Sequence, residues 1–141
     1  MTKSTAGRVL AFDWGLRRIG VAVGNSLLGT SEPLCVLAAK DGNPNWQQVE
    51  QLLNEWQPQL LLVGDPLNMD GSEADITPRA RRFGRQLAGR FNLEVVAVDE
   101  RLSSREARHN RQAAGVVSEA AIDAEAAAVI LQTWLTEQPT A

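Results

Sequence analysis

The sequence predicts an α/β protein with a five-stranded mixed sheet in the order β-β-β-α-β-α-β-α and helices on both faces. Two observations lead to this fold class. Short apolar segments with strand patterns alternate with segments whose apolar residues recur at helical spacing. The 141 residues are 44% apolar and 22% charged, which is typical of a single globular domain. We therefore expect one domain over residues 1–141, with short disordered tails at about 1–6 and 137–141.

The first part of the chain predicts three strands that pair in an antiparallel manner. Residues 8–13, RVLAFD, form an apolar segment that leads into a turn at Gly15. Residues 18–23 alternate branched apolar residues with glycine and alanine, so they predict a second strand that pairs with the first as a hairpin. Residues 34–38 predict the third strand.

The middle of the chain predicts two helices and two further strands. Trp46, Val49, Leu53 and Trp56 recur at helical spacing, with Pro44 suited to the first helical turn and Pro58 ending the helix. The all-apolar run 60–63 indicates a central strand covered on both faces. A helix near 76–91 and a fifth strand over 94–99 follow.

The last part of the chain predicts a short helix, a loop and a buried helix. Ser103 and Glu106 have the spacing of a capping box. Residues 112–118 are predicted to be a flexible loop, and 123–135 an Ala-rich buried helix.

Arginine is concentrated in one region of an acidic chain. The net charge is −3, yet residues 79–111 contain nine arginines and four acidic residues, a local charge of +5. In the helix near 76–91, several arginines lie opposite the apolar face. Arginine forms bidentate contacts with phosphate, so this region predicts a nucleic-acid surface, while a merely solvated helix face stays the alternative. The candidate residues are Arg79, Arg82, Arg85, Arg101 and Arg105.

Several classes of site are excluded by composition. Cys35 is the only cysteine, which excludes an intrachain disulfide and a cysteine-based zinc site, and His109 is the only histidine. The longest apolar runs have six residues, 34–39 and 126–131, far below the length of a membrane helix. No apolar leader segment is found, so we expect a soluble cytoplasmic protein without a membrane partner.

Acidic residues lie at three places where α/β proteins position their chemistry. Asp13 ends the first strand, Asp99 and Glu100 end the fifth, and Asp123 opens the last helix on its apolar face. A carboxylate on a buried face needs a partner, and with no lysine nearby a hard divalent cation is the simplest one. Asp13, Glu100 and Asp123 are therefore the candidate catalytic and metal-binding residues. Together they could hold Mg²⁺ or Mn²⁺ for phosphodiester hydrolysis.

Structural explanations stay open for each of these residues. Asp13 could be a turn residue and Asp123 a helix cap. Glu100 could pair with Arg101 or Arg105. Two acids are secondary candidates for the site: Asp65, which also fits an ordinary turn, and Asp99.

Four segments of the sequence resemble the YqgF-type (RuvX-type) family of small bacterial nucleases with a ribonuclease H-like fold. The segments are FDWGLRRIGVAVGN, LLLVGDPLNMDGSEAD, VVAVDERLSSREA and IDAEAAAVILQTWL, in order from about residue 9 to 136. Members were first proposed as Holliday junction resolvases and later implicated in maturing the 5′ end of pre-16S ribosomal RNA. The resemblance implies a five-stranded ribonuclease H-like fold and an acidic site of Asp13, Glu100 and Asp123.

The resemblance also implies a metal-dependent nuclease that acts on nucleic acid, either precursor rRNA or branched DNA. For a role in rRNA processing, it implies the ribosome as a further partner. The chain departs from the family pattern at three residues and in one segment. Leu16 stands where threonine is usual, Asn25 where an acid is common, and Asp65 where an apolar residue is common. The segment 110–122 is short and lacks the usual basic residue, which affects substrate contacts and not the metal site.

Two other functions fit the same residues. An Asp-x-Gly turn after a strand resembles the phosphate loop of sugar kinases and actin-like ATPases, although those need two facing domains. A non-catalytic RNA- or ribosome-binding protein would use the acids as structural caps. Neither the choice of RNA or branched DNA, nor that of monomer or homodimer, follows from the sequence, because phosphate contacts carry no sequence information.

Overall fold

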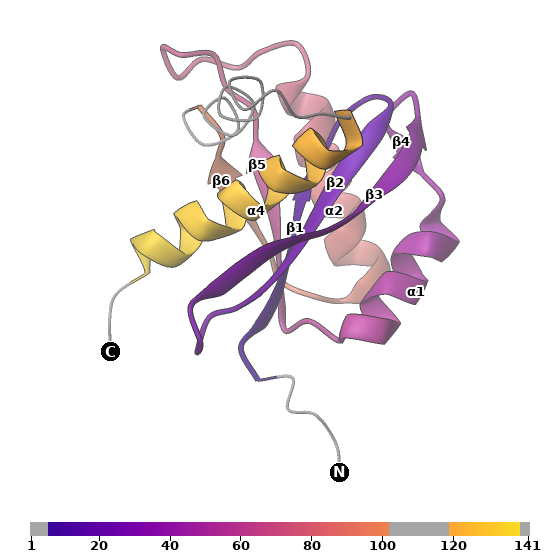
Figure 1. The fold of residues 1–141 in the computed structure, drawn as a ribbon. Helices are drawn as coiled ribbons and strands as arrows, with labels where there is room; N and C mark the ends of the chain where they lie inside the picture. The colour runs from indigo at the N-terminus through magenta and orange to yellow at the C-terminus, as the bar shows by residue number, and fades with distance from the viewer. Residues whose placement is uncertain (1–5, 102–118, 139–141) are drawn as a thin grey trace.

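A mixed sheet with helices on both faces forms the protein (Figure 1), as the sequence predicts. The computed structural model describes residues 6–101 and 119–138. The sheet order is β4-β3-β2-β1-β5-β6, in which β1 to β4 pair antiparallel and β1, β5 and β6 pair parallel. The strands are β1 Arg8–Asp13, β2 Arg18–Asn25, β3 Thr30–Lys40, β4 Asn43–Pro44, β5 Leu60–Asp65 and β6 Val95–Asp99. The helices are α1 Trp46–Trp56, α2 Thr77–Phe91 and α4 Glu119–Glu137.

The strand count differs from the prediction by one. The segment expected to be a turn and a first helical turn instead forms the two-residue strand β4, which pairs with the end of β3. Pro44 therefore precedes α1 rather than opening it, and the side chain of Asn45 caps the helix by accepting from the Gln47 amide at 2.9 Å. Such a short strand depends on its partner and not on its own apolar pattern, so periodicity does not detect it.

The helices end where the sequence provides a stop. Gln57, the first residue after α1, has a left-handed backbone conformation and lies directly before Pro58. Asn92 takes the same conformation after α2. Both residues donate their backbone amide to the last helical turn, a common way to satisfy carbonyls at a helix end.

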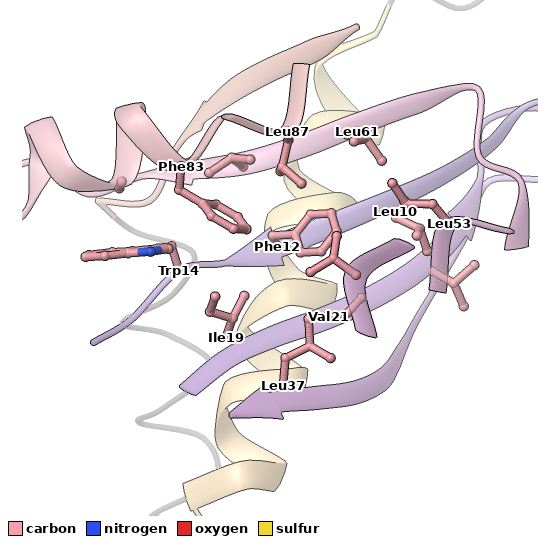
Figure 2. Packing of buried hydrophobic residues seen from close by; sticks show 14 residues of the cluster. Leu10, Phe12, Trp14, Ile19, Val21, Leu37, Leu53, Leu61, Phe83 and Leu87 are labelled. Carbon is pink, nitrogen blue, oxygen red and sulfur yellow. The ribbon is translucent and has the colours of Figure 1, made fainter. Parts of the chain in front are cut away.

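The sheet separates two apolar clusters. On one face, α1 and α2 cover a cluster that includes Leu10, Phe12, Val21 and Phe83 (Figure 2). On the other face, α4 covers Val9, Ala11, Ala22 and Leu62, among others. Figure 2 shows α4 behind the sheet, away from the labelled side chains. Because successive side chains of a strand point to opposite faces, this division tells which face every strand residue occupies.

Some expectations fall on residues outside the described part of the chain. These are the capping box of Ser103 and Glu106, the loop at 112–118, and most of the two predicted tails. In the described ranges, no helix has the length and apolar character needed to cross a membrane.

Candidate active site

Asp13 lies at the end of β1 on the face covered by α4. Val9 and Ala11 belong to the α4 cluster and Leu10 and Phe12 to the other one, so the alternation directs Asp13 toward α4. The residue is only 7% exposed. A buried carboxylate that remains charged needs compensation by hydrogen bonds or a cation.

Gly20 brings the start of α4 onto the strand beside Asp13. In the antiparallel register of β1 and β2, Gly20 is the direct partner of Asp13, so both residues face α4. A Cβ atom at Gly20 would come within 2.0 Å of the backbone oxygen of Asp123. Only glycine therefore allows Asp123 to approach β2 this closely.

Gly64 leaves room for the Glu100 side chain on the neighbouring strand β5. Val63 of β5 pairs with Phe12 of β1, which puts Gly64 at the level of Asp13 on the neighbouring strand. A Cβ atom at Gly64 would lie 2.5 Å from the carboxyl carbon of Glu100, so this side chain lies across β5 on the α4 face. Glu100 is 8% exposed.

The three predicted residues thus lie over three adjacent strands and on one face of the sheet. Neighbouring strands are separated by about 4.8 Å, so Asp123 over β2, Asp13 on β1 and Glu100 over β5 span roughly two strand spacings. Within residues 6–101 and 119–138, however, no three His, Cys, Asp or Glu side chains are gathered closely enough to hold a metal ion as they stand. The oxygen donors suit Mg²⁺ or Mn²⁺, but the side chains are not drawn together into a ligand cage.

Asp123 is instead held by Arg18. Arg18 Nε donates to Asp123 Oδ2 at 2.6 Å, between the first residue of β2 and the second turn of α4. The expectation that Asp123 opens the helix was wrong, because α4 begins four residues earlier, at Glu119. The helix dipole acts mainly on the first turn, so it supports Asp123 only weakly, and Arg18 provides the positive charge.

Sequence reasoning missed Arg18, although a signal was present. Arg18, Gly20 and Ala22 alternate along β2, and Ala22 belongs to the α4 cluster. An arginine two residues before a glycine therefore points to the face of the acidic residues. That face becomes known only when α4 is seen to cover it.

The secondary candidates Asp65 and Asp99 lie on the opposite face, toward α2. They are partners in the β5–β6 register, and each binds an arginine. Arg81 forms a bidentate pair with Asp65 at 2.8 and 3.0 Å, and this hydrogen bonding raises the pKa of Arg81. Arg101 donates to Asp99 through its backbone amide and its side chain, at 2.9 and 2.8 Å, and holds the pKa of Asp99 below its usual value. Both acids therefore form structural ion pairs, across the sheet from Asp13.

The predicted arginines differ in what they contact. Arg79 binds Asp41 at 3.2 Å and lies over the ring of Trp14, with 5.6 Å to the ring centroid. Arg101 forms an ion pair with Asp99 at 2.7 Å. Arg82 and Arg85 are exposed on α2 and form no ion pair with a described residue. Arg105 lies outside the described residues.

A cavity of about 330 Å³ lies on the α2 side of the sheet, lined mainly by small and apolar residues such as Ala80, Gly84 and Ala88. The walls also include Val63 and Val95 from β5 and β6. Asp65, Arg81 and Arg85 also line the cavity. Since Asp13 and Glu100 face the other side of the sheet, the cavity is separate from these two carboxylates.

Comparison with protein families gives one match over almost the whole chain. Residues 7–137 match the family described as "RuvX: Holliday junction resolvase". A protein of Marinobacter nauticus is 52% identical over 134 residues, covering 93% of this chain and 94% of its own length. A protein of Yersinia pestis is 50% identical over 133 residues, covering 92% and 95%. Both carry the name "Putative pre-16S rRNA nuclease".

Solved structures with the same fold include two Holliday junction resolvases. Thermus thermophilus RuvC, determined with a Holliday junction, has a TM-score of 0.52 at 15% identity, covering 92% of this chain and 96% of its own. The Fowlpox virus resolvase, determined with junction DNA, has a TM-score of 0.54 at 10% identity, covering 92% and 99%. At such low identity the likeness establishes the fold alone.

Proposed function

This chain belongs to the RuvX family and is a nuclease that hydrolyses phosphodiester bonds, and we propose that its substrate is the 5′ region of precursor 16S rRNA. The names of the two relatives, which are about half identical over nearly the full chain, support this substrate. The observation that carries the proposed site is the pair of glycines on either side of Asp13: Gly20 leaves room for the backbone of α4 at Asp123, and Gly64 leaves room for the Glu100 carboxylate. The ribosome or its precursor is then a partner.

The proposed catalytic residues are Asp13, Glu100 and Asp123. Their oxygens would hold Mg²⁺ or Mn²⁺, which supplies an activated water and stabilises the leaving oxygen. Asp13 and Glu100 are both buried beside the end of β1. Their carboxylate oxygens are the donors that a hard divalent ion prefers. Asp13 extends from the buried strand β1, which is the kind of rigid placement that catalysis by a positioned ion requires.

Nucleic-acid binding is assigned to the arginine surface of α2. Arg82 and Arg85 are exposed and form no ion pair in the described part of the chain, so their guanidinium groups are available to phosphate. Arg79 and Arg101 already bind Asp41 and Asp99, so we propose a smaller contribution from these two. Arg105 is retained as a proposed contact from the sequence alone.

The test is cleavage of a precursor 16S rRNA fragment beside a four-way DNA junction, each with Mg²⁺ and with Mn²⁺. We expect metal-dependent cleavage of the RNA and its loss in Asp13→Asn. Asn has nearly the same size as Asp and retains an acceptor oxygen, so the variant should still fold and bind RNA. Asp65→Asn is the matched control, because this carboxylate lies on the opposite face, and it should retain cleavage.

A resolvase is the second candidate function, favoured by the family description and by the fold shared with two resolvases. Cleavage of the junction but not of the RNA would support it, and such an enzyme is expected to act as a homodimer, since two strands are cut. RNA binding without cleavage in either metal would instead favour the non-catalytic binding protein.

A further inference from the structure

Arg18 forms an ion pair with Asp123, one of the proposed metal ligands. Its Nε atom lies 2.6 Å from Oδ2 of Asp123, and the two side chains are 35% and 14% exposed. No other hydrogen bond or ion pair of the Asp123 side chain is found within the described residues. Arg18 therefore acts as a counter-ion of this carboxylate.

The other carboxylates share the same face of the sheet. Arg18 and Gly20 lie on the α4 face of β2, and Gly20 is the strand partner of Asp13. Glu100 lies two strands away, over Gly64. The guanidinium thus stands at one side of a row of three acids and reduces their mutual repulsion.

The same positive charge opposes a divalent ion. An ion bound to Asp123 would lie about 5 Å from the guanidinium, given metal–oxygen distances of about 2.1 Å. Even with the screening of bulk water, a unit charge at that distance changes the affinity for a divalent ion by roughly tenfold. Arg18 also holds the Asp123 side chain in one conformation, which favours metal binding. Its contribution through side-chain entropy is smaller than the charge repulsion. Repulsion by Arg18 therefore outweighs the benefit of holding Asp123 in position.

We propose that Arg18 is an internal counter-ion that holds Asp123 in the metal-free protein, lowers the affinity for the divalent ion, and exchanges Asp123 for a phosphate of the nucleic acid. This inference rests on the proposed metal site. When a phosphodiester group binds, its negative charge compensates Arg18, and the repulsion falls. Metal and nucleic acid then bind cooperatively, each raising the affinity for the other by the same factor.

The experiment compares the wild type with Arg18→Gln, using titration with Mn²⁺ alone and thermal melting without metal. Arg17→Gln is the matched control, because Arg17 is the preceding residue, is exposed and makes no ion pair in the described chain. We expect Arg18→Gln to bind Mn²⁺ about tenfold more tightly and to melt at a lower temperature without metal. Arg17→Gln should change the affinity by less than about twofold.

A third measurement tests the exchange with phosphate. A hydrolysis-resistant oligonucleotide should tighten Mn²⁺ binding to the wild type, and this effect should be much smaller in Arg18→Gln. Arg18→Lys keeps the charge and should retain a wild-type affinity for Mn²⁺ within about threefold, which keeps the proposal testable if Arg18→Gln does not fold.

The possible outcomes separate the two proposals. Mn²⁺ binding to the wild type that is unchanged or weakened in folded Arg18→Gln would overturn the role of Arg18 and leave the metal site intact. Tenfold tightening in Arg18→Lys would also overturn it, because the charge is still present. Absence of Mn²⁺ binding in every variant would refute the proposed metal site itself, and the counter-ion role with it.

Discussion

Two glycines decide which side chains can approach Asp13. At Gly20 the obstacle to a Cβ atom is the backbone of α4, whereas at Gly64 it is the tip of the Glu100 side chain. The first contact is rigid and the second is flexible. Substitutions at the two positions should therefore have different effects on stability and on activity.

For Gly64→Ala we expect a strong loss of cleavage with little loss of stability. The new methyl group would displace the Glu100 carboxylate, and a displacement of about 1 Å at a catalytic centre can reduce the rate by about 100-fold. Stability should fall less than for a substitution at Gly20, because at Gly64 the Glu100 side chain has to move and not the backbone of a helix. Cleavage rate and melting temperature on one preparation check this. Gly89→Ala is the control, since a Cβ atom there contacts nothing within 4 Å; retained activity in Gly64→Ala would contradict the role of Glu100.

The Asp99–Arg101 pair predicts a defined pH dependence of stability. Hydrogen bonding to Arg101 lowers the pKa of Asp99 in the folded protein, so the pair stabilises the fold above the unfolded pKa of about 3.9. This contribution is lost as the pH falls through the lower, folded pKa. The melting temperature of Asp99→Asn should be below that of the wild type at pH 7, and the difference should shrink as the pH falls below the unfolded pKa of about 3.9.

Asp75→Asn is the control for that series, because Asp75 is exposed and forms no ion pair in the described structure. It should follow the wild type over the whole pH range. A difference for Asp99→Asn that persists unchanged to pH 2 would show that the pair does not stabilise through its charge.

At the scale of elements, α2 combines two tasks. Its apolar face, with Phe83 and Leu87, packs on the sheet, and its outer face carries arginines. Some of these arginines stabilise the fold, since Arg81 binds Asp65 and Arg90 lies 4.3 Å from the ring centroid of Trp46. A basic helix face is therefore only partly available to a ligand.

Replacing Arg82 and Arg85 by Gln should weaken RNA binding and flatten its salt dependence. Each phosphate contact contributes a slope of roughly 0.7 to 0.9 in the plot of log affinity against log salt, so the slope of the double variant should be smaller by roughly 1.4 to 1.8. The turnover number should stay close to that of the wild type. Filter binding at several salt concentrations measures this, with Arg90→Gln as the control at the far end of α2. An unchanged slope would mean that this face is only solvated.

The α4 helix packs across one face of the sheet. It presents Asp123 from its second turn, and Ser31 of β3 donates to the Ala128 carbonyl at 2.7 Å. Its Ala-rich face can lie close to the strands because alanine needs little space. The position of Asp123 is therefore set by packing along the helix and not by a local turn.

At the scale of the molecule, metal should stabilise the folded protein. A ligand that binds only the native state at about 100 times its Kd adds about 2.7 kcal/mol, which corresponds to an increase in Tm on the order of 8 °C for a domain of this size. Thermal melts with and without Mn²⁺ measure the shift. Asp13→Asn should lose most of it and Asp65→Asn should keep it. Equal shifts in both variants would place the ion elsewhere.

The fold was largely predictable because strand and helix periodicities are local. The strand at Arg8–Asp13 was predicted at its observed bounds, and α2 within one residue. The third strand is longer than its apolar segment, because it pairs with β2 from Thr30 onward. Residues 43–44 became a strand only through pairing with β3, which no local pattern indicates.

By itself, the sequence determined the order of the elements, the α/β class and the acids at the strand ends, since these depend on patterns within a few residues. Tertiary structure decided which acids share a face: it separated Asp65 and Asp99 from Asp13 and placed Glu100 over Gly64. It also brought Arg18 to Asp123, which is 105 residues away in the chain. Such contacts follow from the packing of α4 on the sheet, and a one-dimensional pattern carries no information about which distant residues that packing joins.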